Sequence, residues 1–215
     1  MHLRRRYGDG CGIAQALDVV GERWALLIVR DLVLGPKRFT DLKAGLPGAG
    51  PNILTSRLRD LEAAGVVRRR TLPPPAGSKV YELTEWGAQL DPILSRLGAW
   101  GIRSPVVAPD GDLGADSVML ALRNAFVPGG PSWTARFEFR LGPDRFTVRV
   151  ADGRLAEVSR GLPREPPAAT VETDPKTLVA LLGRRQTVPA AMTAGVLAIT
   201  GDPRAVQRLF DAART

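Results

Sequence analysis

The stretch "GPNILTSRLRDLEAAGVVRRR" (residues 50–70) joins an apolar helical stripe to a strongly basic segment. At 100° per residue, Leu54, Leu58 and Leu61 fall within about 60° of one another and define the buried side of a helix. Gly65 predicts the end of that helix. We therefore expect a helix anchored by leucines and followed by a basic strand.

The side of this helix opposite the leucines is small, polar and basic. It carries Asn52, Ser56 and Arg59, with Thr55 beside them. Because Asn, Ser and Arg can hydrogen-bond base edges in the DNA major groove, which admits one helix, these residues are candidate DNA contacts. Arg57 lies nearer the leucine edge, where it would brace the helix or reach a phosphate. Any surface helix shows polar residues opposite its leucines, so a solvated face is the alternative.

The basic segment predicts the first strand of a hairpin. Alternation along a strand places Arg68 and Arg70 on one face and Arg69 on the other. The return strand is "KVYELT", which begins at Lys79, and the prolines of "PPPAGS" forbid regular structure between the two. These cations can reach backbone phosphates of DNA. The alternative is a basic hairpin that is only solvated.

The elements around this stretch complete a recognisable order. Apolar residues at helical spacing predict helices over 11–21, 22–36, 38–46 and 84–101, the last with Thr84 as its N-cap. A short helix, a tight turn, a second helix and a basic hairpin make a winged helix-turn-helix. The first half is therefore predicted to be a mainly α winged helix-turn-helix domain that binds double-stranded DNA.

The net charge fits a polyanionic partner. The 215 residues are enough for one large domain or two small ones and carry a formal net charge of +8. Residues 1–105 hold 16 Lys and Arg against 10 Asp and Glu, whereas residues 106–215 hold 14 against 12. A basic excess favours nucleic acid first and an anionic membrane surface second, although an arginine-rich genomic bias also produces it.

Residue types that other functions need are scarce. One cysteine, Cys11, and one histidine, His2, rule out an internal disulfide framework, disfavour a metal site and suit a reducing cytoplasm. The sequence has no apolar run long enough to span a membrane, no Ser-His-Asp set, no P-loop and no identifiable pair of catalytic acids. We expect a cytoplasmic protein that is not an enzyme, needs no cofactor or metal and has no membrane partner.

The second half of the chain has a different pattern. A Pro-, Gly- and Asp-rich segment without periodicity predicts a linker over 105–116 between domains at 1–104 and 117–215. Beyond it, "WTARFEFRL" and "DRFTVRVADGRLAEV" alternate like strands, and Asp174 and Asp202, each followed by Pro, predict helix N-caps. The prediction is an α+β domain with a mostly antiparallel sheet covered by helices on one face.

Several separated motifs carry a family resemblance. "CGIAQALDVVGERWALLIVRDLVLGPKRFTDLKAGLPG", "LTSRLRDLEAAGVVRR" and "YELTEWGAQLDPILSRLGAWG" resemble the HxlR-type branch of the MarR-like winged-helix transcription regulators over residues 11–102. The resemblance implies a homodimer on a palindromic operator, with dimer contacts from the terminal helices of this domain. The apolar residues there are Ile13, Leu17, Trp86, Leu90, Ile93, Leu94, Leu97 and Trp100. Each of them is explained equally well as domain core.

The chain departs from that family at two positions. The family usually caps its recognition helix with Ser or Thr, whereas this chain has Gly50 before Pro51. A glycine cap costs only a few tenths of a kcal/mol, so we expect the helix to form. Some relatives sense oxidants or electrophiles through a cysteine matching Cys11, usually followed by Pro, whereas here Gly12 follows. Cys11 is therefore either a redox sensor or a structural residue at the start of a helix.

The C-terminal half carries a second resemblance. "ATVETDPKTLVALLGRRQTVPAAMTAGVLAITGDPRAVQRLFDA" resembles the sterol-carrier-protein type-two fold, within a match over about 115–213. Members of that fold hold lipids or other apolar molecules between a sheet and its helices. The residues that would line such a cavity are Trp133, Phe137, Phe139, Phe146, Val148 and Met192. A domain of this size needs most of its large apolar side chains for burial, so a solid core is the alternative.

Two functions follow from these patterns. The first is a homodimeric, sequence-specific transcriptional regulator whose C-terminal domain senses a small apolar ligand. The second is a lipid-binding or carrier protein whose N-terminal half mediates protein contacts.

Overall fold

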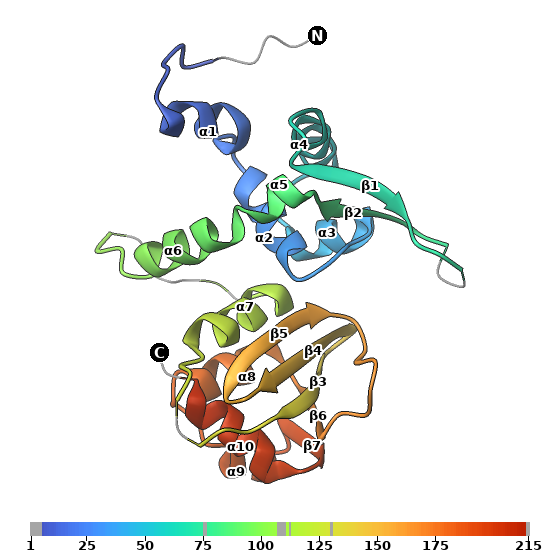
Figure 1. Ribbon diagram of the computed structural model, residues 1–215, viewed down its shortest axis with the longest axis vertical. Coiled ribbons are helices and arrows are strands. Elements are labelled where there is room, and N and C mark those ends of the chain that lie inside the picture. Colours follow the sequence, from blue (N-terminus) through green and yellow to red (C-terminus); the bar gives the residue numbers. More distant parts are fainter. Residues whose placement is uncertain (1–5, 75–76, 107–110, 112, 130, 214–215) are drawn as a thin grey trace. The chain divides into compact units, whose positions relative to one another are not determined.

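A computed structural model of the chain describes residues 6–74, 77–106, 111, 113–129 and 131–213 (Figure 1). The chain divides into two compact units, Met1–Ala108 and Pro109–Thr215. The division falls within the segment predicted as a linker, of which residues 107–110 and 112 lie outside the described residues.

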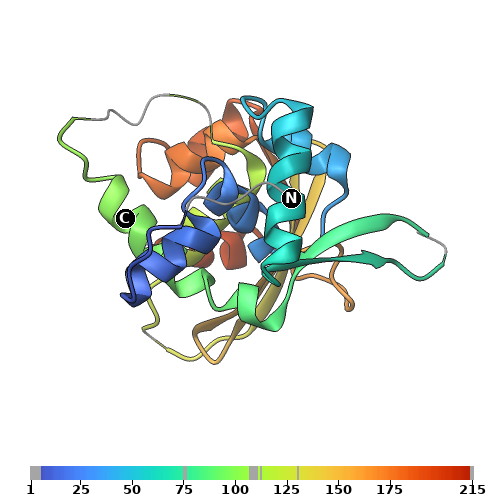
Figure 2. The ribbon, with the colours of Figure 1, turned by 90° about the horizontal axis from the view of Figure 1, so that it is seen from above.

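The first unit has the element order of a winged helix-turn-helix. Its elements are α1 (Gly12–Val20), α2 (Ala25–Val33), α3 (Phe39–Gly45), α4 (Pro51–Ala63), β1 (Val67–Thr71), β2 (Lys79–Leu83), α5 (Glu85–Ala88) and α6 (Asp91–Gly101). Strands β1 and β2 pair antiparallel, from Val67 opposite Leu83 to Thr71 opposite Lys79. Figures 1 and 2 both show this hairpin, the wing, reaching beyond the helices of its unit.

The core of the first unit anchors α4 on its leucine side. Leu54, Leu58 and Leu61 are at most 1% exposed and pack in one apolar cluster with residues of α2 and α3. At the end of α4, Gly65 takes a positive φ of 73°, and the Val66 N–H donates to the Leu61 carbonyl at 2.9 Å. A left-handed residue of this kind satisfies the last carbonyls of a helix and reverses the chain into the next element. The predicted helix and its stop are confirmed.

Two of the predicted helices have different bounds in the structure. The helix expected over 22–36 begins only at Ala25, because Trp24 has left-handed backbone dihedrals with φ 78°. The single helix expected over 84–101 is wrong: it is divided into α5 and α6. Pro92 lies in the first turn of α6, where it has no N–H to donate to the preceding turn. The Thr84 N-cap is confirmed, because its hydroxyl oxygen accepts from the Gly87 N–H at 3.0 Å.

Gly87 allows α5 to lie directly against Val66, in the segment that follows α4. A Cβ added to Gly87 would lie 2.0 Å from the Val66 carbonyl oxygen, so no larger residue fits there. The Thr84 hydroxyl also donates to the Gly65 carbonyl, at 2.6 Å. These contacts connect the end of α4 to the start of the α5–α6 segment.

The second unit is a mixed sheet with helices. Its elements are α7 (Ala115–Ala125), β3 (Ala135–Leu141), β4 (Asp144–Ala151), β5 (Arg154–Arg160), β6 (Ala169–Thr173), α8 (Pro175–Leu182), α9 (Val188–Thr193), β7 (Leu197–Gly201) and α10 (Pro203–Ala212). The strand order is β5-β4-β3-β6-β7, antiparallel except for the parallel pair β3–β6. The sheet is thus mostly antiparallel, as expected.

Two helices of the second unit begin at aspartates that act as N-caps. The Asp174 carboxylate accepts from the Thr177 N–H at 2.9 Å at the start of α8, and the Asp202 carboxylate accepts from the Arg204 N–H at 2.8 Å at the start of α10. Both predicted N-caps are confirmed. Helix α7 begins at Ala115, so the last residues of the segment predicted as a linker are helical.

Candidate DNA-binding surface

The outward row of α4 consists of exposed polar side chains. Asn52, Ser56 and Arg59 are all exposed, on the side of α4 away from the leucines. Within the described part of the chain, none of the three side chains makes a hydrogen bond or an ion pair. Their donors and acceptors are therefore available to an external partner. DNA bases are one such partner, because each presents a distinct pattern of donors and acceptors in the major groove.

Thr55 and Arg57 lie beside this row and already have partners. The Thr55 hydroxyl donates to the Pro51 carbonyl at 2.8 Å, which keeps it within its own helix. Arg57 forms ion pairs with Asp60 at 2.8 Å and with Glu22 at 3.4 Å. Bracing of the helix by Arg57, one of its two predicted roles, is therefore visible in the structure.

The arginines of the wing are paired with carboxylates of their own unit. Arg68 and Arg70 share a face, and both contact Glu82 of β2, at 2.8 and 2.9 Å. Arg69 points to the other face, where it pairs with Glu62 of α4 at 2.9 Å. Its guanidinium also lies 5.2 Å from the centre of the Tyr81 ring. The side chain of Lys79 is exposed at the start of β2.

The sequence interpretation missed these carboxylate partners. Glu82 lies directly opposite Arg68 in the register of the hairpin. Opposite charges on facing positions of a hairpin attract, so an antiparallel pairing of the two predicted strands that satisfies this preference would have placed Glu82 beside Arg68.

The apolar residues assigned to a dimer interface fall into two groups. Six are exposed: Ile13 (72%), Leu17 (41%), Trp86 (51%), Ile93 (57%), Leu97 (44%) and Trp100 (70%). The other two, Leu90 and Leu94, are half-buried and pack against the core of the first unit.

A cleft of about 430 Å³ lies among these helices. It is lined by residues of α1, α5 and α6 and the segments beside them, among them Val19, Trp86, Leu90 and Ile93. The exposed apolar side chains and this cleft lie on α1, α5 and α6. The wing and the outward row of α4 lie on other elements of the first unit.

Cys11 is exposed and lies at the N-cap of α1. The backbone N–H groups of Ile13 and Ala14, at the start of α1, lower the pKa of the Cys11 thiol. A lowered pKa favours the thiolate, which is the reactive form of cysteine. Three consecutive arginines, Arg4 to Arg6, precede Cys11 in the sequence. Arg4 and Arg5 lie outside the described residues.

Most of the residues predicted to line a ligand cavity are wholly buried. Phe137, Phe139, Phe146 and Val148 are 0% exposed and lie on the apolar face of the sheet in the second unit. Met192 of α9 is 41% exposed.

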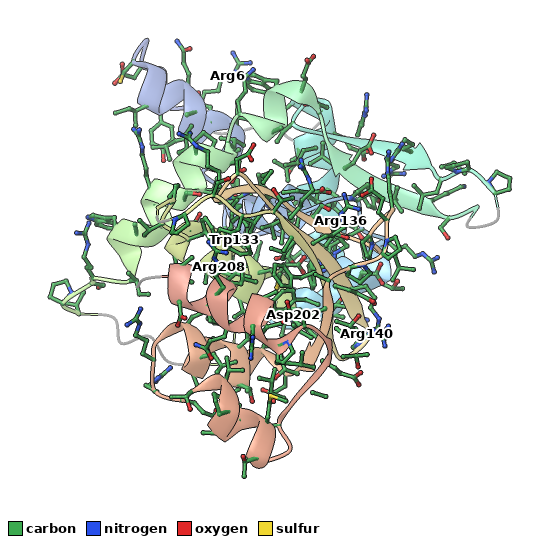
Figure 3. The ribbon with its side chains drawn as sticks, turned by 60° about the horizontal axis from the view of Figure 1, so that its bottom comes forward. Arg6, Trp133, Arg136, Arg140, Asp202 and Arg208 are labelled. Atoms are coloured by element: carbon green, nitrogen blue, oxygen red, sulfur yellow. The ribbon has the colours of Figure 1, made fainter. Side chains whose placement is uncertain are left out.

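Trp133 is half-buried next to this face. Its ring contacts Phe137 edge-on, with centroids 6.3 Å apart, and lies under the guanidinium of Arg208, 4.9 Å from it (Figure 3). Trp133 and Met192 are therefore the accessible members of the predicted set.

In the described ranges, no three His, Cys, Asp or Glu side chains are grouped as they would be around a metal ion. No helix among the same residues is both long and apolar enough to cross a membrane.

Comparisons with known proteins match the first unit. A family model described as HxlR-like helix-turn-helix matches residues 19–105. The HTH-type transcriptional regulator YvaP of Bacillus subtilis (strain 168) is 38% identical over 86 residues, which make up 40% of this chain and 80% of YvaP. The HTH-type transcriptional regulator YodB of the same organism is 35% identical over 85 residues, 40% of this chain and 76% of YodB.

The solved structure of reduced YodB is 32% identical and has a TM-score of 0.40. It covers 45% of this chain, and the match spans 95% of YodB. The matched family model ends at residue 105, so it does not extend into the second unit.

Proposed function

This chain belongs to the HxlR-like helix-turn-helix family of transcriptional regulators, and on that premise we propose that it binds specific sequences in double-stranded DNA. Helix α4 enters the major groove with Asn52, Ser56 and Arg59 facing the base edges. The observation that carries the proposal is the row itself: these side chains are exposed and unpaired in the described chain, and α4 is fixed from behind by its leucines. Thr55 lies beside the row, and the wing cations flank it as phosphate contacts.

The test is a set of titrations of the full chain with DNA. The duplex from upstream of its own gene and a random duplex of the same length are compared at several salt concentrations. Ser56→Ala and Arg59→Ala should each reduce the preference for the upstream duplex roughly tenfold, because one good base contact contributes about 1–3 kcal/mol of discrimination. Arg204→Ala, which removes an exposed arginine at the start of α10, is the charge-matched control. An unaltered preference in Arg59→Ala would remove Arg59 from the base-reading row.

We propose that the DNA-binding form is a homodimer on a palindromic operator. A two-fold symmetric dimer presents two recognition helices to half-sites about one helical turn apart. The exposed Ile13, Leu17, Leu97 and Trp100, on helices that also border the cleft of about 430 Å³, support an interface on α1 and α6, because large exposed apolar surfaces mark protein–protein contact sites.

We also propose that the second unit binds a small apolar molecule that modulates DNA binding. A ligand can do so only if it binds one DNA-binding state of the dimer more tightly than the other. The support is the aromatic face of the sheet, at which Trp133 remains partly accessible. Native mass spectrometry of the purified chain with a panel of fatty acids and sterols tests this point. If none is retained or added, the ligand role of the second unit is rejected, and the DNA-binding proposal is unaffected.

A second input proposed for the same regulator is thiol chemistry at Cys11. The support is the exposed thiol at a helix start, where backbone N–H groups favour its thiolate. Oxidation or alkylation of Cys11 should then change DNA affinity in the wild-type chain and leave it unchanged in Cys11→Ser.

A further inference from the structure

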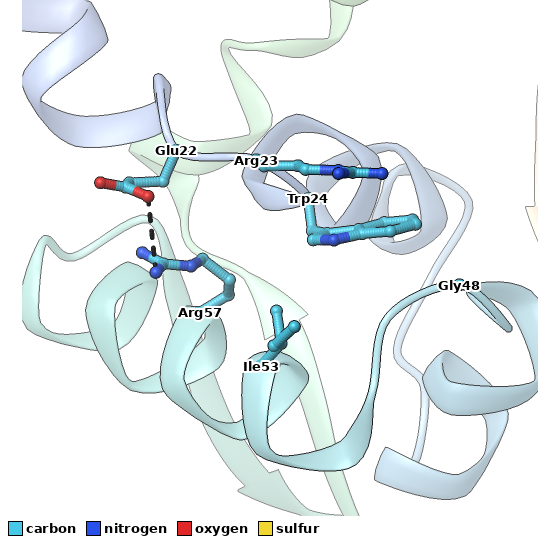
Figure 4. A pocket seen from close by; sticks show the side chains of 6 residues that line it. All are labelled: Glu22, Arg23, Trp24, Gly48, Ile53 and Arg57. Atoms are coloured by element: carbon cyan, nitrogen blue, oxygen red, sulfur yellow. Dashed lines mark ion pairs between the residues drawn. The ribbon is translucent and has the colours of Figure 1, made fainter.

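A cleft of about 300 Å³ opens beside the first half of α4 (Figure 4). Its lining residues are Glu22, Arg23, Trp24, Gly48, Ile53 and Arg57. At 100° per residue, Ile53 and Arg57 share one flank of α4, between the leucines and the outward row. Glu62, which contacts the wing through Arg69, lies on the opposite flank. The cleft and the wing therefore lie on opposite sides of the helix.

Arg23 forms one wall of the cleft and has no carboxylate partner in the described residues. Its guanidinium stacks over the Trp24 ring, 5.2 Å from the ring centroid. The ring in turn packs against Gly48, where an added Cβ would lie 2.8 Å from Trp24 Cη2. An aromatic ring orients an arginine without neutralising it. The Arg23 side chain is exposed, so its charge remains available to an anion.

Arg57 also lines the cleft, with its guanidinium directed toward Glu22 (Figure 4), and it is held by acids that differ in exposure. Asp60, on the same helix, is 2.8 Å away and its side chain is 34% exposed. Glu22 reaches Arg57 at the longer distance of 3.4 Å, and its side chain is 68% exposed. Because the Glu22 carboxylate is mostly exposed and lies at the longer distance, another anion can replace it beside Arg57.

We propose that this cleft binds a backbone phosphate of DNA between Arg23 and Arg57. The inference rests on the proposed insertion of α4 into the major groove, which is about 12 Å wide and bordered by a phosphate backbone on each side. With the wing on one flank of α4, the opposite flank faces the other border of the groove. Arg23 and Arg57 there provide the contact that fixes the position of the helix in the groove. Such a contact carries no sequence information.

The test is Arg23→Ala in the full chain, titrated against the upstream duplex and a random duplex at several salt concentrations. We expect roughly tenfold weaker binding to both duplexes, because a hydrogen bond to a charged group is lost. The slope of log K against log salt should fall in magnitude by about 0.9, the value for one phosphate contact. Arg204→Ala should match the wild type in both measurements. Arg23→Lys should keep the slope, because it keeps the charge.

A second variant tests the role of Glu22. Glu22→Gln removes the carboxylate that competes for Arg57, so binding to both duplexes should become severalfold tighter at low salt. Unchanged or weaker binding would contradict the placement of a phosphate at Arg57.

The outcomes separate this inference from the proposed function. If Arg23→Ala behaves like Arg204→Ala while the wild type prefers its upstream DNA, the phosphate site is overturned and the regulator stands. If Arg23→Ala loses preference instead of losing affinity uniformly, Arg23 reads bases and the phosphate assignment is wrong. A wild type with no preference for upstream DNA would overturn the regulator itself. Thermal unfolding of each variant, followed by circular dichroism, shows that the fold is retained.

Discussion

At the scale of single residues, an ion pair inside the first unit holds the helix-turn-helix in place. Asp31 of α2 and Lys37, which precedes α3, are 1% and 3% exposed, and their charged atoms lie 3.3 Å apart. Lys37 also exchanges backbone hydrogen bonds with Tyr81 of β2. The pair therefore joins α2 to the start of α3 and to the wing. Arg30 adds a second cation, 2.7 Å from the Asp31 carboxylate.

Asp31→Ala should destabilise the first unit by about 3–5 kcal/mol, because it leaves the Lys37 ammonium buried without that carboxylate. Hydrogen exchange of the backbone amides in α2 and α4 reports the unfolding of this unit by itself. The double variant Asp31→Ala/Lys37→Met should recover most of the loss, since no buried charge then remains. A small effect of the single variant would mean that water reaches Lys37 in solution.

The Cys11 thiol should ionise at lower pH in the folded chain than in the unfolded chain. The backbone N–H groups of Ile13 and Ala14 at the start of α1 favour the thiolate and lower its pKa. At any pH near neutrality, the folded chain therefore contains more thiolate. The rate of alkylation by iodoacetamide, measured against pH, should have a lower midpoint for native protein than for protein in urea. Equal midpoints would contradict a thiolate favoured by the start of α1.

At the scale of elements, a carboxylate of the wing itself neutralises part of the positive charge of the wing. Glu82 is 9% exposed and contacts both Arg68 and Arg70, so it neutralises part of the positive charge of the wing. Glu82→Gln should strengthen binding to random DNA severalfold at low salt and steepen its salt dependence, because each freed arginine can release a counterion. Binding titrations with a random duplex measure both quantities. Glu165→Gln, which removes the carboxylate paired with Arg136 in the second unit, is the control and should leave them unchanged.

Residue type predicts the starts of elements better than their breaks. Thr84, Asp174 and Asp202 cap helices as expected, because such a cap depends on one side chain and the N–H groups just after it. The break between α5 and α6 was also readable, since Pro92 disfavours a continuous helix there, but the apolar periodicity continues across it. The late start of α2 was not readable. Trp24 has a left-handed backbone, which bulky residues rarely adopt and which its surroundings impose.

At the scale of the whole molecule, sequence alone could not separate core from interface. Leu94 and Leu97 are both apolar residues of α6, yet the first packs against the core of its unit and the second is 44% exposed. A helix that needs a partner chain and a helix that needs its own core show the same periodicity. The predicted outward row of α4 had no such ambiguity, because polar side chains opposite buried leucines face solvent whatever they bind. Exposure in the folded chain is therefore what turns the apolar residues of α1 and α6 into a candidate interface.

Leu97→Glu should convert the proposed dimer into a monomer. A two-fold interface contains each substituted residue twice, so the variant places two carboxylates in one apolar contact. The mass measured by light scattering after gel filtration should fall from twice the chain mass of 23.1 kDa to that mass. Affinity for a palindromic operator should fall roughly a hundredfold or more, because the two half-sites are no longer bound together. Leu162→Glu, the same change at a residue 69% exposed in the second unit, should leave mass and affinity unchanged. A wild type that is already monomeric on its operator would contradict the interface on α1 and α6.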